Sequence, residues 1–346
     1  MEERQDLTSL TLPELTGATI SCGEKPYRAR QLYEWLHRKG AMSFDEMTNL
    51  PKAYRAAIGE MHPIAAPKIA ARQISAIDGT RKYLFRFADG ACVESVWMSY
   101  HHGNTVCISS QVGCRMGCSF CASTVLGLTR NLTAGEMLSQ IYAIAEDTEE
   151  RVSGVVVMGT GEPLDNYENL VRFIRMLTDE DGLHLSERAV TVSTCGLVPE
   201  ICRLKEEHFA IGLALSLHAP NDDLRRKLMP IARAYPLKDV IEAMCAYYEG
   251  THRRLTFEYA LIRDVNDSGR CAEELSALLR GINCLVNLIP VNPVTESGYR
   301  EPGRERVLSF KKKLENHGIH VTIRREMGRD IDGACGQLRK RLADME

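Results

Sequence analysis

Three cysteines in one short segment carry the clearest chemical signal in the chain. Cys114, Cys118 and Cys121 are spaced C-x3-C-x2-C, and no fourth cysteine follows nearby. Three thiolates can hold three irons of a [4Fe–4S] cube and leave the fourth iron open to a small molecule. Ferredoxin cubanes and structural zinc sites use four ligands instead. The triplet therefore predicts a cluster that serves catalysis rather than electron transfer alone.

The same spacing resembles the signature of radical S-adenosylmethionine (SAM) enzymes, in which the amino and carboxylate groups of SAM occupy the open iron. A second segment agrees with this resemblance. In Gly159-Thr160-Gly161-Glu162 the glycines let backbone approach a ligand closely, and the carboxylate of Glu162 can accept from an ammonium group. The segment resembles the glycine-rich element that holds the amino group of SAM.

These residues need a scaffold that brings them together, and the hydrophobic pattern predicts one. From residue 106 onward, apolar strands alternate with amphipathic helices, which is typical of a parallel sheet covered by helices. The expected strands are 106–109, 152–158, 189–194, 211–217, 255–262 and 285–291. The expected helices are 134–146, 166–177, 199–207, 237–248 and 268–281, with a last helix at 304–316 and a strand at 320–325. The fold class is α/β, a partial (β/α)6 barrel.

Four parts of the chain are expected. Residues 1–65 form a helical accessory domain and residues 66–104 form a linker with a β-strand extension. Residues 105–300 form the radical SAM barrel, and residues 301–346 form a C-terminal helix, strand and loop. In a parallel barrel, ligands bind at the carboxyl ends of the strands. Polar residues fall at those ends: Ser193 after one strand, Ser216 and His218 after the next, and Asn292 after the last. We assign His218 to SAM contact rather than to iron.

Several motifs beyond the triplet carry a closer resemblance. They are residues 107–114 (CISSQVGC), 161–163 (GEP), 216–221 (SLHAPN), 228–231 (LMPI) and 330–338 (DIDGACGQL). Together they are similar to the RlmN/Cfr family of radical SAM RNA methyltransferases, from about Pro26 to Leu338. The resemblance implies a [4Fe–4S] cluster on Cys114, Cys118 and Cys121. It also implies two SAM molecules per turnover and a SAM pocket lined by Gly161, Glu162, Ser193, Ser216, Leu217, His218 and Asn292.

The resemblance further implies a mechanism with a methylated cysteine. One SAM would methylate Cys335, and a second SAM would yield a radical that activates this methyl group for addition to C2 of an adenosine. Glu94 would take the C2 proton, and Cys107 would displace Cys335 and leave a disulfide to be reduced. The implied substrates are 23S ribosomal RNA at the peptidyl-transferase centre and transfer RNA next to the anticodon. An external flavodoxin- or ferredoxin-like electron donor is implied as a partner.

Composition and charge limit the class of protein and the cellular location that we expect. The net charge is −3, so the molecule as a whole is not a basic nucleic-acid binder, although local basic clusters such as Arg225-Arg226-Lys227 occur. We expect such clusters on solvated helix faces. The chain shows neither a long apolar run nor a signal peptide, and we expect a cytoplasmic monomer that does not contact membranes. Most of the remaining cysteines, Cys22, Cys92, Cys202, Cys245, Cys271 and Cys284, are expected to be buried packing residues.

Two alternatives stay open at this point. A Cfr-type enzyme, which methylates C8 of adenosine, would share the cysteine triplet and the SAM pocket. A zinc-stabilised RNA-binding protein without catalysis would use the cysteines differently and would be colourless.

Overall fold

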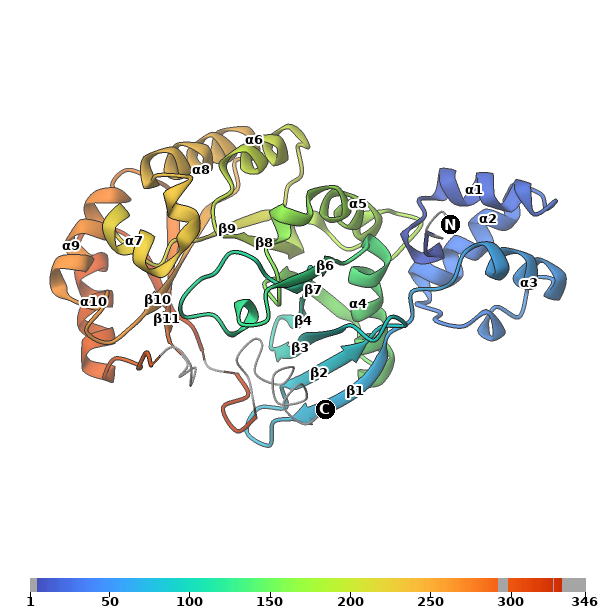
Figure 1. The fold of residues 1–346 in the computed structure, drawn as a ribbon, viewed down its shortest axis with the longest axis horizontal. Helices are drawn as coiled ribbons and strands as arrows, with labels where there is room; N and C mark the ends of the chain where they lie inside the picture. Colours follow the sequence, from blue (N-terminus) through green and yellow to red (C-terminus); the bar gives the residue numbers. More distant parts are fainter. Residues whose placement is uncertain (1–4, 292–297, 326, 332–346) are drawn as a thin grey trace.

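The computed structural model describes residues 5–291, 298–325 and 327–331. The chain begins with a group of short helices that lies to one side of the sheet (Figure 1). These are η1 (Leu7–Ser9), α1 (Leu12–Ser21), α2 (Tyr27–Tyr33), which continues as a π-helical turn over Glu34–Arg38, η3 (Phe44–Glu46) and α3 (Lys52–Met61). This group is joined to the rest of the molecule at α4 (Ala134–Thr148), where the Gly135 amide donates to Ser9 Oγ at 2.7 Å.

One sheet of ten strands organises the remainder of the described chain, in the order β1-β2-β3-β4-β7-β8-β9-β10-β11-β12. The first four strands pair antiparallel, and each later neighbour pairs parallel. The strands are β1 (Lys68–Ile74), β2 (Arg81–Arg86), β3 (Cys92–Tyr100), β4 (Gly103–Ile108), β7 (Val152–Val157), β8 (Val190–Thr194), β9 (Gly212–Ser216), β10 (Leu255–Leu261), β11 (Cys284–Pro290) and β12 (His320–Ile323).

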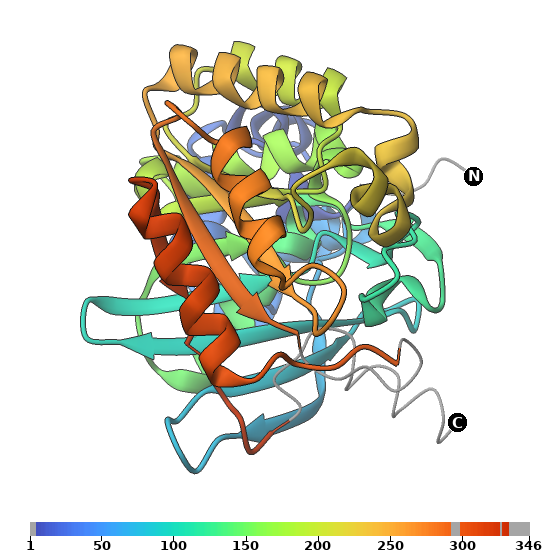
Figure 2. The ribbon, with the colours of Figure 1, turned by 90° about the vertical axis from the view of Figure 1, so that its left-hand side faces the viewer.

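Helices cover the outer face of this curved sheet, as a parallel sheet requires. They are α4, α5 (Tyr167–Thr178), α6 (Val198–Glu206), α7 (Asp222–Leu228), α8 (Leu237–Thr251), α9 (Gly269–Leu278) and α10 (Arg304–Asn316). Figure 2 shows α9 and α10 side by side in front of the last strands. Helix α4 begins at a capping box, in which Thr133 Oγ1 accepts from the Glu136 amide and the Glu136 carboxylate accepts from the Thr133 amide.

The α/β barrel class is confirmed, and the structure adds a strand to it. The chain was expected to supply six parallel strands, with 320–325 as a separate closing strand. Instead β12 pairs parallel with β11 and extends the barrel to seven parallel strands. The reason is that α10 packs back on the sheet and returns the chain in the same direction as β11. In the described residues no helix is long and apolar enough to cross a membrane.

Two expectations about side chains are wrong. Arg225 lies in a basic run but is fully buried, because α7 places it beneath the loop that follows β8. Among the six expected packing cysteines only Cys284 is buried, and Cys202 is exposed. On α6 the buried stripe is filled by Ile201 and Leu204, which leaves Cys202 on the solvent side.

Candidate active site

The cysteine triplet lies on a loop that a small hairpin closes. Strand β5 (Gln111–Gly113) pairs antiparallel with β6 (Leu128–Asn131), and residues 114–127 form the loop between them. The Cys114 amide donates to the Gly127 carbonyl at 3.0 Å, and the Cys121 amide donates to the Cys118 carbonyl at 3.1 Å. The loop is also tied to the end of α7, since the Ser119 amide donates to the Leu228 carbonyl at 2.9 Å. Backbone bonds therefore hold the three thiols in place.

The three sulfurs line one cavity of about 200 Å³ at the carboxyl ends of the parallel strands. Burial raises the pKa of the Cys114 thiol to about 11, and it also raises the pKa of Cys118. Among the described residues, no three His, Cys, Asp or Glu side chains converge as ligands of a single ion. Three thiols that line one cavity can each bind a different iron of a cube.

The glycine-rich segment after β7 makes a close backbone contact with the end of β4. The amides of Ser110 and Gln111 both donate to the Thr160 carbonyl, at 3.0 and 3.2 Å. Gly161 has φ +113°, and a Cβ built there would lie 2.7 Å from Gln111 Cβ. Only glycine fits at this position, and its absence of a side chain keeps the wall of the cavity open at this point.

Glu162 is a buried carboxylate on the cavity wall. Its Oε1 accepts from the Leu164 amide at 3.0 Å and its Oε2 accepts from the Cys195 amide at 2.7 Å. Burial raises the pKa of this carboxyl, and the two amide bonds act in the opposite direction. These bonds fix the carboxylate in direction while leaving it lone pairs, so it can accept from a cationic group in the cavity.

Serines and a histidine from the next strands complete the same wall. Ser193 on β8 and Ser216 on β9 approach to 3.3 Å between their Oγ atoms. The Ala260 amide donates to Nδ1 of His218 at 2.9 Å, and burial lowers the pKa of this histidine to about 3. The ring is therefore neutral with its proton on Nε2, which makes it a hydrogen-bond donor for a ligand. It is unsuited to bind a ligand through positive charge.

The structure brings most of the predicted site residues together. The cavity is lined by Cys114, Cys118, Cys121, Gly161, Glu162, Ser193, Ser216 and His218. Leu217 lies between two of them but is fully buried, and its amide donates to the Glu258 carbonyl at 3.0 Å. Asn292 and Cys335 lie outside the described residues.

Glu94 and Cys107 lie away from the cavity wall, on the inner face of the sheet. Residues paired across neighbouring strands point to the same face. Cys107 on β4 pairs with Val96 on β3, and Glu94 lies two residues before Val96. The thiol and the carboxylate therefore share one face. The opposite face is covered by α4, where Ser95 Oγ donates to Gln140 at 2.7 Å.

Arg225 is a site residue that the sequence did not reveal. It is fully buried and donates to the carbonyl of Cys195 at 2.6 Å and to that of Leu217 at 3.4 Å. Its Nη1 has no hydrogen-bond partner among the described residues. Burial raises the pKa of Cys118, and the charge of the Arg225 guanidinium acts in the opposite direction. A buried cation with an unused donor needs an anion nearby.

These features fit a [4Fe–4S] cluster with SAM. The three thiolates and the carboxylate of SAM are anionic and would complement Arg225, and the ammonium of SAM would complement Glu162. The glycine contact at Gly161 leaves room for a ligand at the wall.

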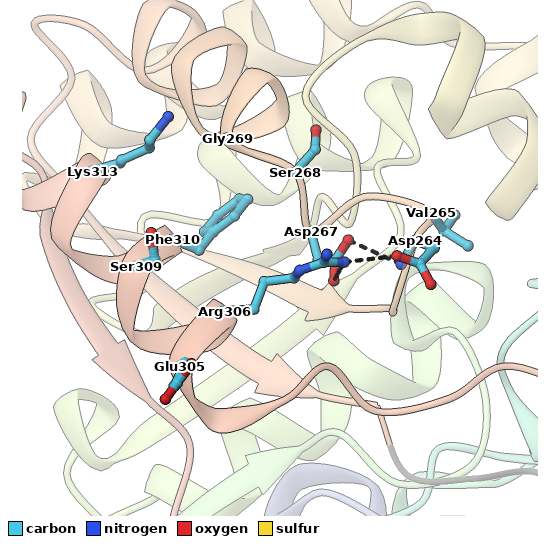
Figure 3. Close-up of a pocket in the computed structure, with 10 residues that line it drawn as sticks. All are labelled: Asp264, Val265, Asp267, Ser268, Gly269, Glu305, Arg306, Ser309, Phe310 and Lys313. Carbon is cyan, nitrogen blue, oxygen red and sulfur yellow. Dashed lines mark hydrogen bonds and ion pairs between the residues drawn. The ribbon is translucent and has the colours of Figure 1, made fainter.

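A separate cavity of about 850 Å³ lies between α9 and α10 (Figure 3). Most of its charged groups are paired: Arg306 bonds Asp264 at 2.7 Å and Asp267 at 3.0 Å. Lys313 bonds Glu273 at 3.0 Å. The hollow is on the outer side of the sheet, away from the cysteine triplet, and its lining includes neither a cysteine nor a histidine.

Comparisons with known proteins agree with this geometry. Residues 108–272 match the family model of the radical SAM superfamily, and residues 5–64 match the model of the ribosomal RNA large subunit methyltransferase N-terminal domain. A probable dual-specificity RNA methyltransferase RlmN of Lachnoclostridium phytofermentans is 56% identical over 342 residues, which are 99% of this chain and 96% of the relative. The protein of the same description from Lachnospira eligens is 56% identical over 339 residues, covering 98% and 97% of the two chains.

Among solved structures, a radical SAM methyltransferase from Sphaerobacter thermophilus superposes with a TM-score of 0.92 at 47% identity. The match covers 96% of this chain and 98% of that one.

Proposed function

Because this chain belongs to the RlmN family of radical SAM RNA methyltransferases, we propose that it methylates C2 of adenosine in 23S ribosomal RNA and in transfer RNA through a methylated cysteine. It is an enzyme that uses a [4Fe–4S] cluster and SAM. The proposed targets are the peptidyl-transferase centre and the position next to the anticodon. The observation that carries the proposal is the single cavity where the cysteine triplet meets Gly161, Glu162, Ser216 and His218.

In this proposal Cys114, Cys118 and Cys121 hold the cluster, and the cavity wall holds SAM. The carboxylate of Glu162 accepts from the ammonium of SAM, and Nε2 of His218 donates to the ligand. Ser193, Ser216 and Asn292 supply further polar contacts, and Leu217 supplies packing. When bound, the cluster and SAM supply a 5′-deoxyadenosyl radical.

The remaining groups handle the RNA base. Adenine C2 is an electrophilic carbon, so it cannot attack the methyl of SAM directly. A thiol-bound methyl on Cys335 solves this problem, because its carbon can add to C2 once it has lost a hydrogen atom. The adduct is covalent and must be released. Glu94 takes the C2 proton. The thiolate of Cys107 then attacks the sulfur of Cys335, and the bond from this sulfur to the exocyclic carbon breaks. That carbon keeps the electron pair and takes a proton to become the methyl group, while the two cysteines form a disulfide that is later reduced.

The shared face of Glu94 and Cys107 supports these roles. Glu94 on β3 and Cys107 on β4 lie on neighbouring strands, and both point to the inner surface of the sheet. An adenine exposed from its RNA could meet both there. The short N-terminal helices are proposed to contact the RNA, and a flavodoxin- or ferredoxin-like protein is proposed to donate the electrons. We place the enzyme in the cytoplasm as a monomer.

The test is to map the methyl group. The purified holoenzyme, SAM, a chemical reductant and unmodified transfer RNA or a 23S RNA fragment are incubated, and the nucleosides are analysed by mass spectrometry against standards. We expect 2-methyladenosine. Formation of 8-methyladenosine would identify a Cfr-type enzyme, and a colourless protein that modifies no RNA would reject radical chemistry altogether.

A further inference from the structure

Lys82 is a fully buried lysine on strand β2. Its side chain is 0% exposed, and its Nζ lies 3.0 Å from Oε2 of Glu94, which is 4% exposed. The neighbouring side chains point the other way, because Arg81 and Tyr83 both bond Asp147 on α4. The alternation of the strand therefore places Lys82 on the inner face of the sheet.

The register places this lysine beside the groups proposed for catalysis. Lys82 and Cys107 both pair with Val96 of β3, one from each side. Glu94 lies two residues along β3 on the same face. Two strand spacings separate Lys82 from Cys107, about 10 Å. An ammonium, a carboxylate and a thiol thus occupy one patch of the inner face.

A buried ion pair of this kind needs an explanation, because removing two charges from water is costly. An apolar pair could fill the same space at no such cost. We propose that Lys82 is a positioning residue for the proton acceptor: its ammonium holds the Glu94 carboxylate at the inner face, where the adenine is attacked. This inference rests on the proposed function, which assigns proton removal to Glu94.

The chemistry of the step agrees with a carboxylate held by a cation. The covalent adduct is a radical and must first give up one electron to a one-electron acceptor, for which the oxidised iron–sulfur cluster would serve. The C2–H bond then breaks, its electron pair stays on the ring, and the proton passes to an oxygen of Glu94. Because this loss restores the aromatic ring, a weak base is sufficient. Glu94 then becomes neutral beside a buried ammonium. The ion pair forms again for the next turnover once this proton has passed to solvent.

The experiment separates this step from those before it. The full-length holoenzyme is prepared with Lys82→Met, Lys82→Gln, which keeps a hydrogen-bond donor without charge, and Lys82→Arg, which keeps the charge. Arg81→Met is the matched control, since it breaks an ion pair at the adjacent residue on the opposite face. Four quantities are measured for each: iron content, methyl on the Cys335 peptide, covalent protein–RNA adduct, and methylated RNA.

We expect both neutral variants at Lys82 to retain iron and methylated Cys335. They should form product at least about 10-fold more slowly, as expected for impaired general-base catalysis, and should accumulate the covalent adduct. Lys82→Arg should recover most of the turnover, and Arg81→Met should resemble the wild type. A purely structural role would lower iron content and Cys335 methylation without trapping RNA.

Several results would overturn the proposal. They are wild-type turnover in Lys82→Met, loss of product without adduct while Cys335 is methylated normally, or failure of both neutral variants to retain iron. Glu94→Gln and Cys107→Ala serve as references that should both trap RNA. If the references trap no RNA, the proposed function fails at its release steps. If they trap RNA and the neutral Lys82 variants turn over freely, only the role of Lys82 is rejected.

Discussion

Replacing Gly161 by alanine tests the close backbone contact that shapes the cavity. An added Cβ would lie 2.7 Å from Gln111 Cβ, 2.8 Å from Ser110 Oγ and 2.9 Å from the Gln111 amide nitrogen. Gln111 cannot move freely, because it is fully buried and its Oε1 accepts from the Glu162 amide at 2.8 Å. The backbone at φ +113° adds a conformational cost of about 1–3 kcal/mol. Crowding adds about 1–3 kcal/mol, so the expected loss in free energy of unfolding is about 2–6 kcal/mol.

Urea unfolding of the apo-protein measures this loss, and two glycines separate its causes. Gly281 also has a positive φ, +79°, but nothing lies within 4 Å of an added Cβ. Gly281→Ala should therefore cost only the conformational part, about 1–2 kcal/mol. Gly17 lies within helix α1, also in open space, so Gly17→Ala should be neutral or stabilising by up to about 1 kcal/mol.

The reasoning would be refuted if Gly161→Ala cost no more than Gly281→Ala, since the crowding at Gln111 would then be absent. A second readout is SAM binding to the reconstituted protein, measured by equilibrium dialysis. It should weaken in Gly161→Ala and stay unchanged in both controls, because only Gly161 lies on the cavity wall.

Three further predictions concern the cluster, acid stability and the buried ion pair. Cys118→Ala should abolish the four-iron cluster and SAM cleavage, and retention of four irons with SAM cleavage would contradict the ligand assignment. Burial lowers the pKa of His37 to about 3, so the unfolded chain alone takes up a proton below about pH 6.5, and stability should fall with acidification by up to about 1.4 kcal/mol per pH unit. His37→Gln should remove that part of the slope in urea unfolding between pH 7.5 and 5.5, and an unchanged slope would refute the assignment. Lys82→Met should cost about 3–5 kcal/mol of stability because it leaves a buried charge, whereas Lys82→Met combined with Glu94→Met should cost much less; additive losses in this double-mutant cycle would argue against the pair.

The elements of the barrel could be predicted because their signals are local. Buried parallel strands are continuous apolar runs, and capping residues mark the ends of helices in the sequence. The expected helix at 304–316 has those bounds in the structure, and α4 begins at Ala134, the expected first residue. The pairing of β12 with β11 could not be predicted in the same way, because strand order depends on how α10 packs.

The site residues also divide into those that a local sequence signal reveals and those that depend on distant contacts. The cysteine triplet and Gly161 could be recognised from the sequence, because each belongs to a motif of a few consecutive residues. Lys82 and Arg225 could not be found in this way. Each looks like an ordinary surface cation in its own segment, and its burial arises from contacts with distant segments: β3 for Lys82, and the loop after β8 for Arg225. In strand β2 the side chains alternate, so Lys82 and the apolar ring of Tyr83 point to opposite faces of the sheet. This alternation is a signal in the sequence that could have indicated the inward position of Lys82.

The fate of a deuterated methyl group tests the central claim most directly. The holoenzyme is supplied with SAM bearing a trideuterated methyl group, a reductant and unmodified RNA, and the nucleosides and 5′-deoxyadenosine are analysed by mass spectrometry. A methyl that passes through Cys335 and loses one hydrogen atom before adding to the base must reach C2 with two deuterium atoms, while the third appears in 5′-deoxyadenosine. Retention of all three deuterium atoms in the RNA product, or a methyl group at C8, would contradict the account.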